Sequence, residues 1–206
     1  MEKQGTLFVI SGPSGVGKGV LCDAIIRKNP NLGFSVSATT RAPRAGELDG
    51  VHYFFLSVAE FEEHLSADHF LEYTKIYGNF YGTLESPVRD RLANGQDVVL
   101  DIDTQGARRL RERFPQAVFI FILPPSMEEL RARIMRRGTE SPEDMEKRLM
   151  EGWEEIRNIS NYDYVFVNDN LDEAVGRLEA IVLAESLRVE RQRNLWWSYI
   201  KEESDV

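Results

Sequence analysis

Near the N-terminus stands the stretch LFVISGPSGVGK, residues 7–18, and it decides the fold. Its first four residues are apolar, which is typical of a buried strand in a parallel sheet. The apolar residues of 20–27 then recur at helical spacing. A strand, a glycine-rich loop, a lysine and a helix in this order are typical of a phosphate-binding P-loop, because the loop turns backbone N–H groups toward phosphate oxygens. We therefore predict a phosphate site here, with Lys18 reaching the outer phosphates.

The loop departs from the usual pattern directly after its lysine. A Ser or Thr at this position commonly holds Mg²⁺ through its hydroxyl. This chain has Gly19 there, followed by Val20, and neither side chain can ligate a metal.

Composition narrows the classes of function. A chain of 206 residues with 42% hydrophobic content suits one compact α/β core with inserted lobes, or two small domains. A net charge of −9 disfavours a general nucleic-acid-binding surface, so local arginines must meet any anionic ligand. The single cysteine, Cys22, excludes an intrachain disulfide. No apolar run approaches a membrane span and the first residues lack a signal-peptide pattern, so we expect a cytoplasmic protein that binds no membrane.

The order of predicted elements favours an α/β fold with a parallel sheet and helices on both faces, of the P-loop NTPase type. The further strands are predicted at 34–36, 98–100, 117–123 and 164–167, and the later helices at 127–136, 142–157 and 171–193. We divide this single domain, residues 1–206, into a core (1–36, 95–125 and 158–206), a small mixed α/β lobe (37–94) and a helical lid (126–157). Within the lobe we expect short strands at 53–56 and 70–77 and a helix at 58–65.

Polar residues follow the predicted strands of the sheet. Gly12, Ser37, Asp101 and Asn168 come just after apolar runs. Ligands of parallel sheets bind at the carboxyl ends of strands, so these residues could surround one site.

A second anion site is predicted beside the loop. Ser37, Arg41 and Arg44 lie within eight residues, with Tyr53 shortly after. Two guanidinium groups and two hydroxyls suit phosphate oxygens. The alternative is a solvated basic loop.

Asp101 and Asp103 follow the apolar strand at 98–100. A carboxylate at this place commonly serves Mg²⁺, directly or through water. The alternative, an N-cap for a helix that starts at residue 104, applies to at least one of them.

Arginines gather in the predicted lid. Arg137, which precedes a glycine, and Arg148 are candidates for stabilising charge that develops during phosphoryl transfer. For Arg131 and Arg133 we favour an exposed helix face with glutamate partners.

Taken together, these motifs resemble guanylate kinases over nearly the whole chain. The specific blocks are SATTRAPR at 37–44, GVHYFF at 50–55, FYGT at 80–83 and LDIDTQG at 100–106.

The resemblance implies a role for each matching position. The GMP phosphate would be held by Ser37, Arg41, Arg44, Tyr53 and Tyr81. Glu72 would accept from guanine N1–H and the amino group, Thr83 would donate to O6, and Asp103 would assist at the base edge. The ATP site would comprise Gly12, Pro13, Ser14, Gly15, Val16, Gly17, Lys18 and Gly19, with Asn168 near the adenine. Catalysis would fall to Lys18, Arg41, Arg44, Arg137 and Arg148, with Mg²⁺ entering with ATP and Asp101 binding it through water.

The implied reaction is ATP + GMP giving ADP + GDP, with dGMP as a further acceptor and a place in purine nucleotide metabolism. One alternative is a guanylate-kinase-like binding module impaired in catalysis, which the missing hydroxyl at Gly19 and Val20 would suit. Another is a P-loop kinase acting on a sugar phosphate, against which Glu72 and Thr83 argue, because a sugar has no guanine edge. The sequence leaves the oligomeric state open.

Overall fold

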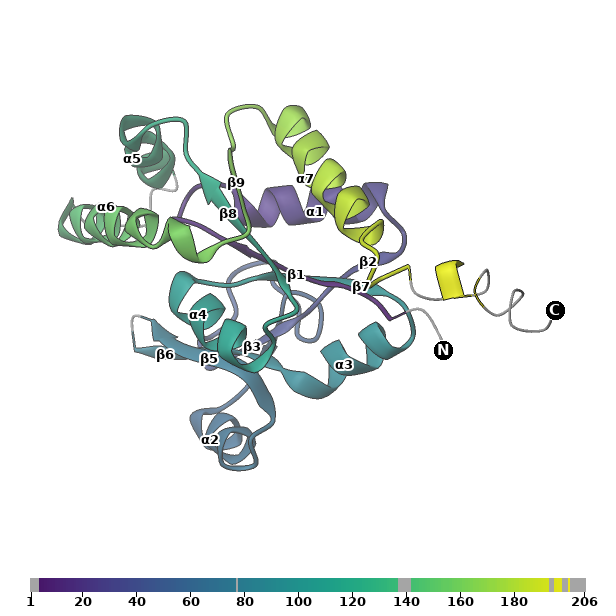
Figure 1. The fold of residues 1–206 in the computed structure, drawn as a ribbon. Coiled ribbons are helices and arrows are strands. Elements are labelled where there is room, and N and C mark those ends of the chain that lie inside the picture. The colour runs from purple at the N-terminus through teal and green to yellow at the C-terminus, as the bar shows by residue number, and fades with distance from the viewer. Residues whose placement is uncertain (1–3, 77, 137–141, 193–194, 198–199, 201–206) are drawn as a thin grey trace.

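Five parallel strands form the central sheet of the computed structural model, which describes residues 4–76, 78–136, 142–192, 195–197 and 200 (Figure 1). In spatial order they are β2 (Leu32–Phe34), β7 (Asp97–Asp101), β1 (Leu7–Ser11), β8 (Val118–Leu123) and β9 (Tyr164–Val167). The first strand of the chain lies in the middle, between β7 and β8. The predicted parallel sheet is confirmed.

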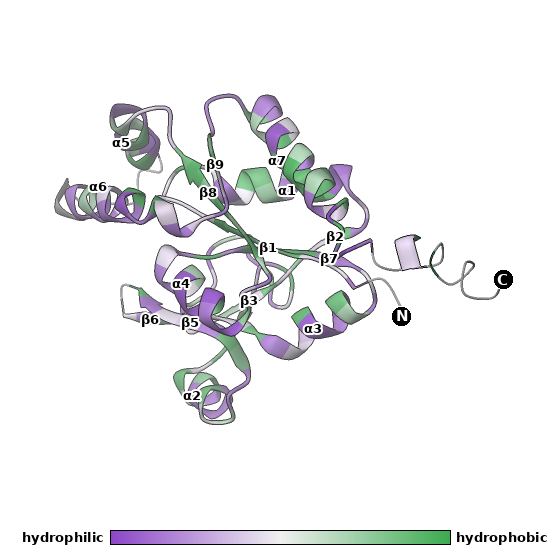
Figure 2. Ribbon diagram, in the orientation of Figure 1, coloured by the Kyte–Doolittle hydropathy of each residue, from purple (hydrophilic) through white to green (hydrophobic). Residues whose placement is uncertain are grey.

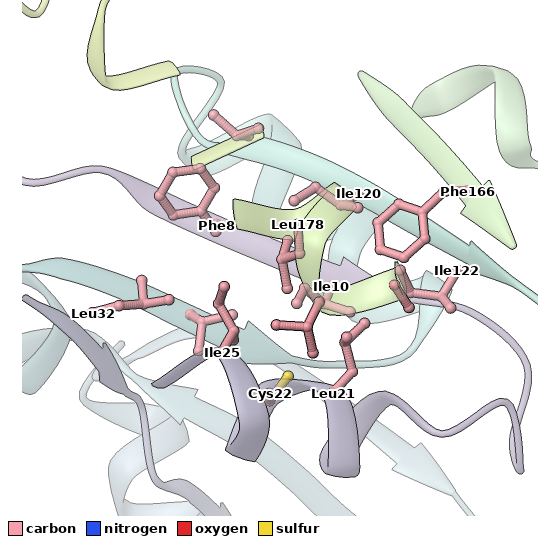
Figure 3. Packing of buried hydrophobic residues seen from close by; sticks show 14 of the residues in the cluster. Phe8, Ile10, Leu21, Cys22, Ile25, Leu32, Ile120, Ile122, Phe166 and Leu178 are labelled. Carbon is pink, nitrogen blue, oxygen red and sulfur yellow. The ribbon is translucent and has the colours of Figure 1, made fainter. Parts of the chain in front are cut away.

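Helices cover both faces of this sheet. One face carries α1 (Lys18–Lys28) and α7 (Leu171–Ser186), and the other α3 (Glu85–Ala93) and α4 (Thr104–Arg113) (Figure 1). Along β1, Phe8 and Ile10 pack with the first pair of helices, as Figure 3 shows, while Leu7 and Val9 pack with the second. Burial on both faces explains the unbroken apolar run of β1, and the same run appears as the green centre of Figure 2.

A second, mixed sheet forms the inserted lobe. Its order is β4 (Tyr53–Phe55), β3 (Ser37–Thr39), β6 (Asn79–Leu84) and β5 (Phe70–Ile76). Helix α2 (Val58–Ser66) begins at a capping box in which Ser57 and Glu60 each accept the other's backbone N–H. Its Phe61 ring stacks on Phe70, with centroids 4.4 Å apart, and so attaches α2 to the sheet.

Near this lobe, one predicted strand has the wrong bounds and one helix was missed. The strand predicted at 34–36 is instead β2, which ends at Phe34, and β3, which begins at Ser37 in the other sheet. Helix α3 was not expected at all, because only Val88 and Leu92 of its residues are buried. Both side chains join the core cluster, so residues 85–93 pack with the core.

The last helix is shorter than predicted. It ends at Ser186 rather than residue 193. The Ser186 carbonyl accepts a hydrogen bond from the Gln192 side chain at 2.6 Å, and the Ser186 hydroxyl donates to the Leu183 carbonyl at 2.7 Å. These contacts satisfy carbonyls that a longer helix would have used.

A helical arm lies at the carboxyl end of β8. It consists of α5 (Met127–Arg136) and α6 (Pro142–Arg157), with the predicted bounds, and a short 3-10 helix, η1 (Ile159–Asn161), follows it. Leu130, Ile134 and Leu149 pack the two helices together. Helix α6 also lies against the glycine-rich loop, since a Cβ at Gly152 would be 3.4 Å from the Pro13 side chain. Among the described residues, no helix is long and apolar enough to cross a membrane.

Candidate functional site

The glycine-rich loop, residues 12–19, connects the carboxyl end of β1 to α1. Gly12, Gly15 and Gly17 have φ angles of 146°, 91° and 99°, which other residues rarely adopt. Space is equally limiting, because a Cβ at Gly12 would lie 2.3 Å from the Ile122 carbonyl oxygen. Gly17 caps α1 without any side-chain hydrogen bond, so the first N–H groups of the helix face the loop interior. Such a curl of backbone donors at a helix N-terminus suits an anion.

Lys18 lies at the mouth of this loop. Its Nζ donates to the Gly12 carbonyl at 2.6 Å and lies 4.0 Å from Asp101 Oδ1. The lysine is therefore held over the loop by a backbone oxygen that a phosphate oxygen can replace.

Asp101 ends β7 opposite the position where a hydroxyl residue is usual. A Cβ at Gly19 would be 3.9 Å from Asp101 Oδ2, so a side chain at position 19 would lie next to this carboxylate. The neighbouring Val20 is 59% exposed. No cluster of three or more metal-ligating side chains occurs in the described part of the chain. One carboxylate beside a phosphate loop fits Mg²⁺, which keeps several waters and is held largely by phosphates.

Asn168 and Arg133 brace the loop from outside. Asn168 follows β9 and is buried, and its Nδ2 donates to the Val16 carbonyl at 2.8 Å. Arg133 on α5 donates to the Val16 carbonyl at 3.2 Å and to the Asn168 carbonyl at 3.1 Å. The expectation for Arg133 was incomplete: it does pair with Glu129, at 2.9 Å, yet it also ties α5 to the loop. Arg131 behaves as expected and pairs with Glu146 at 2.6 Å.

The predicted anion site gathers on the second sheet, and we name Ser37, Arg41, Arg44, Tyr53 and Tyr81 the arginine site. Ser37 is the register partner of Tyr53, and the Tyr53 and Tyr81 rings meet edge to face, with centroids 6.1 Å apart. The Arg41 guanidinium lies over the Tyr53 ring, 5.5 Å from its centroid. The Arg44 side chain is exposed.

Glu47, which the sequence analysis missed, already engages this site. Its two carboxylate oxygens accept from Arg41 Nη2 at 2.9 and 3.0 Å, and one of them accepts from the Arg44 N–H at 2.7 Å. Burial works against the charged form, but these donors outweigh it and lower the pKa of Glu47. The arginine site thus holds a carboxylate in the arrangement that suits an oxyanion.

A buried carboxylate lies further along the same sheet, and we name Glu72, Thr83 and Gly106 the carboxylate pocket. Glu72 on β5 is 4% exposed, and its register partner Thr83 on β6 donates to Glu72 Oε1 at 2.7 Å. Burial raises the pKa of Glu72 to about 7; the charge of Asp103 adds to this, while the Thr83 hydrogen bond and Arg109 oppose it. Because the Thr83 proton points at Glu72, donation to a ligand would require the hydroxyl to turn.

Asp103 is the N-cap of α4, as the alternative interpretation proposed. Its Oδ1 accepts from the N–H groups of Gln105 and Gly106 at 2.7 and 2.9 Å. This fixes the first turn of α4 next to Glu72. A role at a ligand base edge remains a prediction.

The helical arm contributes Arg148 and an unexpected carboxylate. Arg148 is half-buried on α6, whereas Arg137 lies outside the described residues. Glu155, also on α6, has a buried Oε2 without a hydrogen-bond partner. Burial raises the pKa of Glu155 to about 7, with Lys18 opposing the rise and Asp103 and Glu151 adding to it.

A groove of about 1240 Å³ separates this arm from the second sheet. Lys75, Ile76 and Gly78 line it on one side, Glu151 and Glu155 on the other, and Asp103 at its base. Ligand pockets are usually about 300–1,000 Å³, so a nucleotide has ample room. The lining residues come from β5, the turn at Gly78, the start of α4 and the stretch from α6 to Asn158, and none of them belongs to the phosphate loop, the arginine site or the carboxylate pocket.

Comparisons with known proteins agree with this arrangement. A sequence model of the family described as "Guanylate kinase" matches residues 4–185. The chain is 53% identical over 204 residues to a guanylate kinase of Caldanaerobacter subterraneus subsp. tengcongensis, covering 99% of this chain and 98% of that relative. It is 47% identical over 201 residues to one of Clostridioides difficile, covering 98% of each. A crystal structure of guanylate kinase from Anaplasma phagocytophilum superposes with a TM-score of 0.78 at 34% identity, covering 92% of this chain and 90% of that one.

Proposed function

The chain belongs to the guanylate kinase family and phosphorylates GMP with ATP, and we propose that the phosphoryl group passes directly, in line, from ATP to the GMP phosphate. The assignment of GMP as the acceptor rests on the carboxylate pocket. A buried carboxylate beside a hydroxyl matches guanine, which presents N1–H and amino donors next to the O6 acceptor.

Adenine would be rejected at the same place. It has an unprotonated N1, so Glu72 would face an acceptor and lose its hydrogen bonds in a buried site. Unpaired buried polar groups discriminate strongly, by factors of about 10⁴–10⁵ in sites built for hydrogen bonding. A sugar phosphate has no guanine edge, so Glu72 and Thr83 would have no base to contact.

The remaining residues position the two nucleotides and neutralise charge. The phosphate loop and Lys18 hold the ATP phosphates, and Arg133 and Asn168 keep the loop in shape. The arginine site holds the GMP phosphate, with Arg41 and Arg44 displacing their contacts to Glu47 in favour of the ligand. Arg148 on the arm stabilises the transferring group, and we assign the same role to Arg137, which lies outside the described residues.

No general base is required, because the acceptor is already a phosphate anion. Catalysis then consists of orientation and electrostatic stabilisation. Water must be kept away from ATP, which assigns a covering role to the lobe at 37–94 and the lid at 126–157.

Mg²⁺ fits beside Asp101, held mostly by phosphate oxygens and water. When bound, it neutralises charge on the ATP phosphates. Asp101 would then accept hydrogen bonds from metal-bound water and keep Lys18 close to the loop. The absent hydroxyl at Gly19 and Val20 weakens this site without removing it.

We also propose dGMP as an acceptor, recycling of GMP as the metabolic role, and the cytoplasm as the location. Relatives named guanylate kinase at about half identity favour an enzyme over a binding module.

The test is an ADP-release assay with ATP and Mg²⁺ and, separately, GMP, dGMP, AMP, CMP and UMP. Turnover with GMP and dGMP alone is expected. Inversion at a chiral phosphorothioate would support in-line transfer, whereas retention would indicate a covalent intermediate. Equal turnover of GMP and AMP would overturn the role of Glu72.

A further inference from the structure

Gly106 lies directly beneath the Glu72 carboxylate, in the first turn of α4. A Cβ built on Gly106 would be 2.5 Å from Glu72 Oε2 and 3.2 Å from Glu72 Cδ. Real carbon and oxygen atoms do not approach so closely without bonding. The carboxylate therefore occupies the space that any other residue at position 106 would fill.

Backbone conformation does not explain this glycine. Gly106 is helical and is not among the glycines with positive φ. Alanine is the better helix former at such a position. The remaining physical reason for glycine is the close approach of Glu72.

We propose that Gly106 is a positioning residue for acceptor specificity, whose missing side chain lets the Glu72 carboxylate lie where it reads guanine. The inference rests on the proposed function, since it assigns Glu72 to the GMP base.

The other contacts of Glu72 make its position sensitive to Gly106. Thr83 holds Glu72 Oε1 from the side of β6 at 2.7 Å. Asp103 fixes the Gly106 N–H at 2.9 Å, and Arg109 on the same helix donates to the Tyr73 carbonyl of β5. The Asp103 cap thus holds the first turn of α4, and Arg109 joins the helix to β5 within one turn of Gly106. We therefore expect an added methyl group to move the carboxylate rather than the backbone.

The first variant is Gly106→Ala, with Gly176→Ala as the matched control. Gly176 is also helical, and a Cβ there would meet nothing within 4 Å. We expect Gly106→Ala to bind GMP about 100-fold more weakly by calorimetry, since the displaced carboxylate loses its charge-assisted hydrogen bonds to guanine. The KM for ATP should stay within the range of the control. GMP affinity within twofold of wild type would overturn the proposal.

A shorter carboxylate provides the second test. Glu72→Asp withdraws the group from position 106, so adding Gly106→Ala to Glu72→Asp should weaken GMP binding by less than threefold, against about 100-fold in the wild-type background. Equal losses in both backgrounds would show that the methyl group acts elsewhere, and would overturn the proposal.

The pH profile separates positioning from a general structural effect. GMP affinity of the wild type should fall as pH drops below about 7, where Glu72 takes up a proton. Asp103 and Arg109 are the charged groups that influence Glu72, and both remain in the variant. In Gly106→Ala the displaced carboxylate is better solvated, so the midpoint should move to lower pH. An unchanged midpoint would contradict the proposal.

Calorimetry keeps this inference distinguishable from the function itself. Wild-type protein that binds GMP without transferring phosphate would remove the proposed mechanism and leave the Gly106 test intact. Wild-type protein that binds no GMP would remove both.

Discussion

In the proposed function, the phosphate loop and the carboxylate pocket bind their ligands by opposite means. The loop offers backbone N–H groups from consecutive residues, with Lys18 as the charged side chain at its mouth. The pocket uses the side chains of Glu72 and Thr83 on neighbouring strands, set against a helix. A phosphate offers oxygens in every direction, so backbone donors suffice. A base must be told from another base, which requires a buried carboxylate whose pKa is raised by the burial.

Removing Lys18 breaks the loop side of this comparison and should have the largest effect. Lys18→Met is expected to lower kcat by about 10³-fold, because it deletes a positive charge at the transferring phosphate. GMP affinity should be unchanged. Steady-state kinetics and GMP calorimetry measure this, with Lys28→Met, on the exposed side of α1, as the control. Equal losses in kcat and GMP affinity would contradict the separation of the two regions.

Glu72→Gln tests the carboxylate pocket. The amide presents donors where guanine also donates, so kcat/KM for GMP should fall by about 10²–10³-fold. The KM for ATP should stay constant. Kinetics with both substrates test this against Glu62→Gln on the surface of α2. A rise in the KM for ATP as large as that for GMP would show that the residue supports the fold rather than the acceptor.

Arg133 helps to hold the shape of the phosphate loop, so Arg133→Met should weaken the ATP site and leave the GMP site unchanged. Hydrogen bonds to charged groups contribute about 1.5–3 kcal/mol, and partial compensation by Asn168 should leave the KM for ATP raised about tenfold. The KM for GMP should not change. Arg131→Met, which removes the pair with Glu146, is the control. Similar kinetics in the two variants would remove the bracing role.

Glu155 on α6 is a second buried carboxylate, and we expect its burial to reduce the stability of the protein. Its pKa in the folded protein, about 7, exceeds the ordinary value of 4.5, so the folded state binds the proton more tightly. Stability is therefore lost as pH rises from about 4.5 through 7, and Glu155→Gln should recover about 1–2 kcal/mol at pH 8 and nothing at pH 4. Thermal unfolding at both pH values measures it, with the exposed Glu154→Gln as control. A gain at pH 4 as large as that at pH 8 would contradict the assignment.

The smallest expected effect comes from completing the loop. Gly19→Ser would put a hydroxyl within reach of the Asp101 side, since a Cβ there lies 3.9 Å from Oδ2. We expect an affinity for Mg²⁺ and ATP about threefold higher, because one more oxygen ligand joins a site held mostly by phosphates. Calorimetry with magnesium and ATP measures it, and Val20→Thr, at an exposed position, compares the neighbouring site. No change in either variant would show that the missing hydroxyl is no handicap.

The sequence predicted the loop well, because strand, turn and helix are local patterns. The bounds of α5 and α6 followed from periodicity in the same way. Arg133 was underestimated because its glutamate partner is four residues away, while its loop contacts are 117 and 35 residues away. Gly106 lies within the motif at 100–106, yet its proposed role depends on Glu72, a side chain of the second sheet. Nothing in the glutamate-rich stretch near Glu155 distinguishes the buried residue from its exposed neighbours.

The position of β1 has a consequence for how the chain is made. Its partners β7 and β8 lie about a hundred residues further along, so β1 leaves the ribosome with no strand to pair with. At about 5–20 residues per second, it waits roughly 5–20 s for β7 to be synthesised. During that interval an apolar strand is exposed on both faces, which invites chaperones or aggregation. The strand that ends in the phosphate loop is thus the first to be made and among the last to be protected.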